Sequence, residues 1–176
     1  MILQALYFFI PAYISNMIPV FVKRINFLNY PIDANKTWRG KRILGDHKTW
    51  RGLFFGTLSG FLIFELQRSL YNKGILTNLA LINYSTAPIF LGALLGFAAL
   101  FGDSLKSFFK RQMDIRPGKP WVPFDQFDFL VTTVIITIPW SGITLIDSLL
   151  VLTIIFFLTI IVQYSGYKLK LKNDKL

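Results

Sequence analysis

The stretch ILQALYFFIPAYISNMIPVFV, residues Ile2–Val22, decides the class of fold because it contains no charged residue. At about 1.5 Å of rise per residue, a helix of this length crosses a hydrocarbon core of about 30 Å. Its two prolines are tolerated in membrane helices, where neighbouring groups satisfy the freed carbonyls. A cleaved signal peptide is the alternative, but the stretch lacks a basic start and a small-residue cleavage site. We therefore predict a first membrane span.

Further apolar stretches predict an all-α, polytopic membrane protein of one domain with five transmembrane helices. The chain of 176 residues is 53% hydrophobic and has a mean hydropathy of +0.51. The second stretch ends near Glu65, Gln67 and Arg68, so by itself it could be a re-entrant or interfacial segment. Small residues that favour close helix packing lie in the second and third stretches: Gly56, Ser59, Gly60, Gly92 and Gly96. The predicted spans are about 2–22, 53–70, 87–108, 127–146 and 149–167.

Basic residues are concentrated on one side of this topology. Of the 19 Lys and Arg, 17 lie in two loops and the C-terminal tail, and only Arg68 and Lys73 lie elsewhere. The positive-inside rule then places the loops of about 23–52 and 106–128 and the C-terminus in the cytoplasm, with the N-terminus outside. This segregation explains the net charge of +10 without a nucleic-acid partner. The absence of cysteine excludes a disulfide framework and a Cys-based zinc site.

Three aspartates are expected at the cytoplasmic ends of the third and fourth spans. Asp103 follows an apolar run, and a carboxylate at the membrane is costly enough to suggest a function. Asp125 and Asp128 are three residues apart, on one face of a helix that begins there, although they could simply complement the helix dipole. Oxygen ligands at this density suit Mg²⁺. We predict that Asp103, Asp125 and Asp128 bind the metal.

Basic residues beside these carboxylates favour a site for phosphates. Carboxylates for a divalent metal next to Lys and Arg are the usual parts of a site that handles nucleotides. The residues concerned are Lys106, Lys110, Arg111, Arg116 and Lys119.

The first loop contains a repeated motif, NKTWRG at Asn35–Gly40 and HKTWRG at His47–Gly52. Threonine, lysine and backbone amides near glycine are natural phosphate contacts. The tryptophans could anchor at the membrane interface or stack on a base. His47 is the single histidine, which excludes a His-based metal site or catalytic triad. We predict that six residues contact the nucleotide and its phosphates: Asp46, Lys48, Thr49, Arg51, Lys106 and Arg116.

Three sequence blocks resemble the archaeal CDP-archaeol synthases, which belong to the CTP-transferring cytidylyltransferases that make CDP-activated lipids. The blocks are LGDHKTWRG at 44–52, GDSLKSFFKR at 102–111 and PFDQFDF at 123–129. The resemblance covers essentially the whole chain. Arg116–Pro117 replaces the Lys-Asp of the bacterial enzymes, which favours the archaeal family. The resemblance implies Mg²⁺ as cofactor and five catalytic residues: Asp103, Lys110, Arg111, Asp125 and Asp128.

The reaction that the resemblance implies joins CTP to 2,3-bis-O-geranylgeranylglyceryl phosphate, giving CDP-archaeol and pyrophosphate. The partners are thus CTP, a prenylated glycerol-phosphate lipid and the membrane. A phosphate monoester is already largely dianionic at neutral pH, because its second pKa is about 6, so no general base is needed. One alternative is a small transporter or channel with a cation pathway at Asp103, which is disfavoured because the polar residues gather at one membrane border. Another is a scaffold that holds anionic lipid.

Overall fold

The computed structural model describes residues 2–115, 121, 124–141, 144, 146, 150, 153 and 157, without the side chains of 124–128, 130 and 141. Arg116, Lys119 and most of the predicted fifth span lie outside the described residues. Leu150, Thr153 and Phe157, which belong to that predicted span, are helical.

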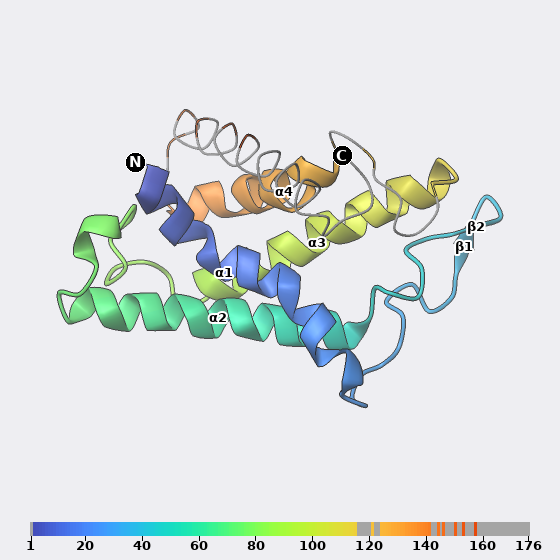
Figure 1. The fold of residues 1–176 in the computed structure, drawn as a ribbon, viewed down its shortest axis with the longest axis horizontal. Coiled ribbons are helices and arrows are strands. Elements are labelled where there is room, and N and C mark those ends of the chain that lie inside the picture. The colour runs from blue at the N-terminus through green and yellow to red at the C-terminus, as the bar shows by residue number, and fades with distance from the viewer. Residues whose placement is uncertain are drawn as a thin grey trace, which may run out of the picture.

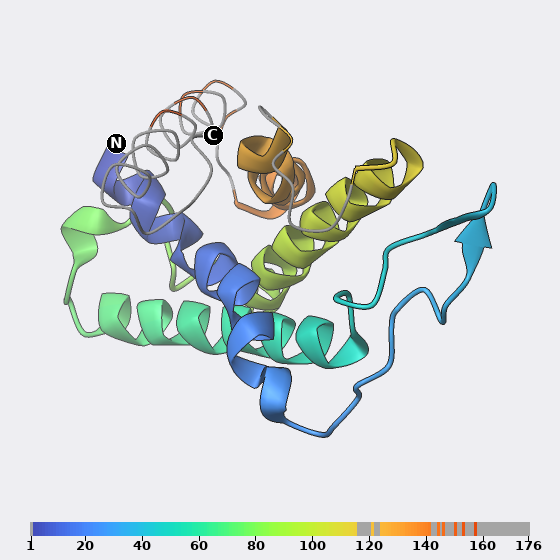
Figure 2. The ribbon, with the colours of Figure 1, turned by 45° about the vertical axis from the view of Figure 1, so that its right-hand side comes forward.

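Long helices dominate the described residues (Figure 1). They are α1 (Ile2–Phe21), α2 (Trp50–Asn72), α3 (Leu91–Gln112) and α4 (Phe124–Ser141). Short 3-10 turns follow α1 and α2, namely η1 (Val22–Arg24) and η2 (Thr77–Leu79). The loop between α1 and α2 forms a small antiparallel hairpin of β1 (Thr37–Trp38) and β2 (Lys41–Arg42), which the sequence did not predict. Figures 1 and 2 both show this hairpin projecting from the helices, far from the N-terminus.

The helix bounds differ by a few residues from the predicted spans 53–70, 87–108 and 127–146. α2 begins earlier, at Trp50, because the Thr49 side chain caps it by accepting a hydrogen bond from the Gly52 amide at 3.2 Å. α3 begins later than predicted, at Leu91, and continues to Gln112. α4 begins at Phe124 and is described to Ser141.

Two of the described helices are long and apolar enough to cross a membrane, Ile2–Arg24 and Leu91–Gln112. α2 is not among them, since it carries Arg51, Glu65 and Arg68. The described apolar part of α4, Val131–Trp140, is shorter. The chain is therefore mostly helical with two apolar helices, and the count of five spans stays a prediction.

The packing of α2 against α3 confirms the predicted role of the small residues. A Cβ atom added to Gly60 would lie 2.7 Å from the Gly92 carbonyl oxygen and 2.9 Å from the Gly96 Cα. Such distances are too short for any side chain, so the two helix backbones touch. Ser15 of α1 reaches the same place, because its Oγ would lie 2.8 Å from that Cβ.

Further toward the N-terminal end of α1, an aromatic core of Phe8, Phe9, Phe64 and Tyr84 is fully buried.

Candidate functional site

The loop between α1 and α2 folds back on itself just before α2 begins. Pro31 and Thr49 form an isolated antiparallel bridge. Beside it, the Ile32 amide donates to the Lys48 carbonyl at 2.8 Å, and the Trp50 amide donates to the Tyr30 carbonyl at 3.0 Å. The backbone around Lys48 is thus fixed to an earlier part of the loop.

Lys48 extends from this fixed backbone to α3. Its ammonium donates to the Oδ2 atom of Asp103, and the Lys106 ammonium lies 3.4 Å from the Oδ1 atom. The three side chains are between 18% and 22% exposed. Two cations therefore flank one half-buried carboxylate, which offsets the cost of removing that charge from water. The structure thus brings Lys48 to two further predicted site residues, Asp103 and Lys106, although Lys48 and Asp103 are 55 positions apart in the sequence.

The hairpin contacts α3 further along, near the end of that helix. The Lys41 ammonium lies 2.5 Å from Oδ2 of Asp114 and donates to the Gln112 carbonyl at 2.8 Å. The Trp38 ring packs on the Phe108 ring with centroids 5.5 Å apart. The first loop and the C-terminal end of α3 thus lie at the same end of the molecule, as the predicted topology requires.

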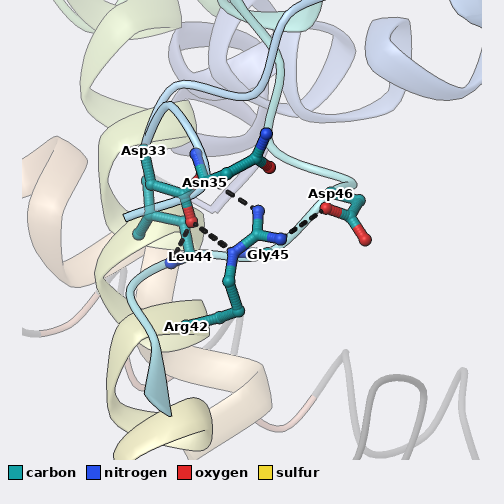
Figure 3. A network of polar contacts seen from close by, with 6 residues as sticks. All are labelled: Asp33, Asn35, Arg42, Leu44, Gly45 and Asp46. Carbon is teal, nitrogen blue, oxygen red and sulfur yellow. Dashed lines mark hydrogen bonds and ion pairs between the residues drawn. The ribbon is translucent and has the colours of Figure 1, made fainter. Parts of the chain in front are cut away.

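A buried carboxylate, Asp33, organises the loop at the base of the hairpin (Figure 3). Its oxygens accept hydrogen bonds from the amides of Leu44 at 2.9 Å, Gly45 at 3.0 Å and Asn35 at 3.1 Å. The Arg42 guanidinium adds a bond of 3.1 Å. Burial alone would raise the pKa of Asp33, but these donors outweigh it and lower the pKa to about 2.

Sequence reasoning missed Asp33. One signal was present, because Asp33 and Asn35 form the local turn that an Asp side chain makes with the amide two residues on. The bonds to Leu44 and Gly45 span 11 and 12 positions and have no such local signature.

Two cavities adjoin the Lys48–Asp103 pair. The first, here called the helix cavity, has a volume of about 420 Å³ and lies among the end of α1, the start of α2 and α3. The second, here called the basic cavity, has a volume of about 360 Å³ and lies between the first loop and α3. Both volumes fall within the range of small-molecule sites. Asp46, His47 and Lys48 line both cavities and form the wall between them.

The basic cavity combines residues from both predicted phosphate-binding regions. Its charged lining consists of Arg42, Asp46, Lys48, Lys106, Lys110 and Arg111. These are five cations and one carboxylate, and Asp33 and Asp103 pair with Arg42, Lys48 and Lys106 from outside the cavity. Cations still outnumber carboxylates, so the local potential is positive and attracts an anion. The predicted residues Lys110 and Arg111 thus lie beside Lys48 and Lys106, as a phosphate site requires.

The helix cavity holds two more of the predicted nucleotide contacts, Thr49 and Arg51, together with Asp103. The Arg51 side chain is buried, and its Nη1 atom donates to the Ile25 carbonyl at 2.5 Å. Its Nε atom is buried with no hydrogen-bond partner within the described part of the chain. An unsatisfied buried donor is costly, so an acceptor supplied by a ligand would stabilise it. Asn16, Lys23 and Asn29 also line this cavity, and the sequence analysis did not single them out as site residues.

Asp125 and Asp128 lie in the first two turns of α4, which packs against α3. The end of α4 lies at the start of α3, because the Trp140 and Phe90 rings have centroids 5.1 Å apart. The two packed helices are therefore antiparallel, and the start of α4 lies toward the C-terminal part of α3. Their side chains lie outside the described residues, as does all of Arg116. Among the side chains that the structure describes, no three His, Cys, Asp or Glu residues are placed to hold a metal ion. The predicted metal site of Asp103, Asp125 and Asp128 therefore stays a prediction.

The chain matches the family model "CarS-like: CDP-archaeol synthase" over residues 1–175. The chain belongs to the CDP-archaeol synthase family. It is 35% identical to the CDP-archaeol synthase of Pyrococcus furiosus over 173 residues, covering 98% of this chain and 96% of that one. The Methanospirillum hungatei CDP-archaeol synthase is also 35% identical, over 93% of this chain and 98% of its own. The family resemblance seen in the sequence is thus confirmed.

A solved structure supports the same family at the level of fold. It is described as "Structural insight into an intramembrane enzyme for archaeal membrane lipids biosynthesis" and matches with a TM-score of 0.67 and 27% identity. The match covers 92% of this chain and 94% of the other. Together with the two apolar helices, this likeness assigns the present member of the CDP-archaeol synthase family to the membrane.

Proposed function

We propose that the protein is a CDP-archaeol synthase, which transfers the cytidylyl group of CTP to 2,3-bis-O-geranylgeranylglyceryl phosphate and releases pyrophosphate. The observation that carries this function is the position of Lys48, which pairs with Asp103 and separates two cavities lined by cations. Lys48 can thus contact an anion in either cavity. A cation pathway at Asp103 is not supported, because two ammonium groups flank that carboxylate.

The reaction needs charge neutralisation and alignment more than acid–base chemistry. A phosphate oxygen of the lipid attacks the α-phosphorus of CTP, the bond from that phosphorus to the bridging oxygen breaks, and pyrophosphate leaves with the electron pair. The barrier arises largely from repulsion between the dianionic lipid phosphate and the triphosphate. Fixed cations reduce this repulsion, and positioning the two substrates in line lowers the entropic cost.

The basic cavity is the proposed site for the phosphates of CTP. Lys110 and Arg111, which are proposed as catalytic residues, lie there with the nucleotide contacts Asp46, Lys48 and Lys106. The remaining proposed nucleotide contacts are Thr49 and Arg51, which line the helix cavity, and Arg116.

Magnesium is the proposed cofactor, and the donor set is of the right chemical type. Asp103 offers a carboxylate beside the basic cavity, and Asp125 and Asp128 belong to the adjoining start of α4. Hard oxygen ligands together with substrate phosphates are the usual environment of Mg²⁺. Asp103, Asp125 and Asp128 would hold the ion, which would neutralise charge on the phosphates. In the structure, the ammonium groups of Lys48 and Lys106 balance the negative charge of Asp103.

The proposed membrane arrangement has five spans, with the site at the cytoplasmic border. The spans are 2–22, 53–70, 87–108, 127–146 and 149–167, with the loops 23–52 and 106–128 and the C-terminus in the cytoplasm and the N-terminus outside. In support, the first loop and the end of α3 lie together. The prenyl chains of the lipid then stay among the helices while its phosphate reaches Asp103.

The decisive experiment is an assay of the purified chain in lipid nanodiscs with radiolabelled CTP and Mg²⁺. Ether-linked prenylated glycerol phosphate and ester-linked phosphatidic acid are supplied in parallel. We expect a labelled CDP-lipid and an equal amount of pyrophosphate with the ether lipid. Absence of product with both lipids, together with no saturable CTP binding by calorimetry, would contradict the function and favour a scaffold that binds anionic lipid.

A further inference from the structure

The carboxylate of Asp33 lines neither cavity, yet it holds the segment that lines both (Figure 3). Its side chain is completely buried. It accepts hydrogen bonds from the amides of Leu44 and Gly45, at 2.9 and 3.0 Å. A carboxylate that accepts from successive amides fixes the direction of the backbone there, because charge-assisted bonds are stronger and more directional than neutral ones.

The same short stretch of the loop also fixes the other end of that segment. The Ile32 amide, next to Asp33 in the chain, donates to the Lys48 carbonyl at 2.8 Å. The segment Leu44–Lys48, here called the arch, is therefore attached near both ends to two consecutive residues. Asp46 and His47 lie between these attachments, and they form the wall between the cavities together with Lys48.

Arg42 links Asp33 to the arch a second time. Its Nη2 atom donates to Asp33 Oδ1 at 3.1 Å, while its Nη1 atom lies 2.8 Å from Oδ1 of Asp46. The guanidinium is thus held between two carboxylates, one fully buried and one exposed. Because Arg42 also lines the basic cavity, Asp33 determines where one cation of that cavity stands.

Part of the backbone around these contacts adopts left-handed conformations. Ala34 and Asn35 have φ values of 47° and 62°, and Gly45 has a φ of 93°. Left-handed conformations at residues other than glycine are costly and persist only where surrounding contacts enforce them. The hydrogen bond from the Asn35 amide to Asp33 supplies such a contact, whereas Gly45 adopts its positive φ at little cost.

We propose that Asp33 is a positioning residue for CTP binding, which sets the arch Leu44–Lys48 and the Arg42 guanidinium in place for the nucleotide phosphates. This inference rests on the proposed function. It predicts a larger effect on CTP than on the lipid phosphate, because the whole arch and Arg42 line the basic cavity, whereas only Asp46, His47 and Lys48 also line the helix cavity.

The test compares Asp33→Asn with the parent chain in nanodiscs, with Asp114→Asn as the matched control. Asp114 also docks the hairpin, through Lys41, but it is 76% exposed and lines neither cavity. We expect the KM for CTP to rise about tenfold or more in Asp33→Asn, because an amide cannot replace both carboxylate oxygens as acceptors. We expect kcat and the KM for the lipid phosphate to stay within about threefold, since saturating CTP draws the arch back into place. Asp114→Asn should change no constant by more than about twofold.

Limited trypsin digestion without substrates gives a second measurement that does not depend on activity. The arch and hairpin contain cleavage sites at Arg42 and Lys48, which should be cut at least about tenfold faster in Asp33→Asn than in the parent if local opening controls cleavage. Equal cleavage rates, an unchanged KM for CTP, or an equal rise in the KM for the lipid would overturn the inference. A parent chain that binds no CTP would refute the proposed function and with it the role in CTP binding. Faster cleavage of Asp33→Asn would even then show that Asp33 fixes the arch.

Discussion

The Lys48 ammonium and the Asp103 carboxylate form an ion pair across 55 positions of the chain, joining the first loop to α3. Neither side chain is more than 22% exposed. The pair stands where the helix cavity and the basic cavity meet. It therefore fixes the relation between the loop that would bind the nucleotide and the helix that would carry a ligand of the metal.

Replacing Lys48 by methionine should reduce kcat/KM for CTP by about 100-fold or more, because a fixed cation would be lost from the site of the developing charge. Methionine keeps most of the length of the side chain and removes the charge. Lys41→Met is the matched control, since Lys41 pairs with the exposed Asp114 outside both cavities. Its activity should stay within about twofold of the parent. Steady-state assays of both variants decide the matter, and equal activities would exclude Lys48 from the site.

Asp125→Asn and Asp128→Asn should each abolish formation of the CDP-lipid while leaving the protein folded. Each substitution removes the negative charge of a proposed metal ligand but keeps its shape. Helix content by circular dichroism and the elution volume in size-exclusion chromatography should match those of the parent. Full activity of either variant with radiolabelled CTP would contradict its assignment to the metal.

Removal of divalent cations should stop the reaction completely. An excess of EDTA should reduce product formation to background, and added Mg²⁺ should restore it, because the proposed carboxylates need the ion to bind phosphates. The measurement is product formation against the concentration of free Mg²⁺. Ca²⁺ is a useful comparison, since it prefers more ligands at longer distances and should restore little activity. Activity that survives EDTA would count against a metal at these aspartates.

Acidification should loosen the first loop over a defined range of pH. The pKa of Asp33 is lowered to about 2 from an ordinary value of 3.8. The stabilisation that its carboxylate gives is therefore complete above about pH 4 and is lost as the pH falls through about 2. Hydrogen exchange measured by mass spectrometry should show the amides of Leu44 and Gly45 losing protection over this range. In Asp33→Asn the same amides should show low protection at every pH, and a parent-like pH dependence there would refute the assignment.

Gly60→Ala should destabilise the helices by about 1–3 kcal/mol, the usual cost of overpacking. The new methyl group would lie within 3 Å of the backbone of α3, which cannot move aside as a side chain can. Leu62→Ala is the control on the same helix, because Leu62 is 56% exposed. Thermal unfolding in detergent should show a lower midpoint for Gly60→Ala than for Leu62→Ala. The reverse order would indicate that the close contact is not needed.

The sequence predicted the main helices and the concentration of basic residues at one end of the molecule, because both depend on local composition. Uncharged stretches of membrane length predicted α1 and α3 closely, and the glycines of α2 and α3 predicted their close contact. The sequence predicted that Lys48 and Asp103 belong to one site that binds phosphate and metal, and the contact between them is consistent with that prediction. Their pairing as such could not be deduced, since it depends on how the loop folds back through Pro31 and Thr49.

The repeated KTWRG motif shows where sequence reasoning stops. In the first copy Thr37–Trp38 form β1, and Arg39 and Gly40 turn the chain with φ values of 52° and 76°. In the second copy Thr49 caps α2 and Trp50 begins it. The same five residues take two conformations because different residues follow them. Lys41–Arg42 pair back onto β1, whereas the apolar stretch after Gly52 continues a helix.

The glycine contact between α2 and α3 also restricts how a two-tailed lipid can reach the enzyme. At Gly60, Gly92 and Gly96 the two backbones touch with no side chain between them, so a prenyl chain cannot pass there unless the helices separate. We therefore expect a lipid that enters laterally from the bilayer to use a different boundary between helices. The α2–α3 pair would stay fixed while the lipid enters. Binding of the lipid would then depend on movement of other helices.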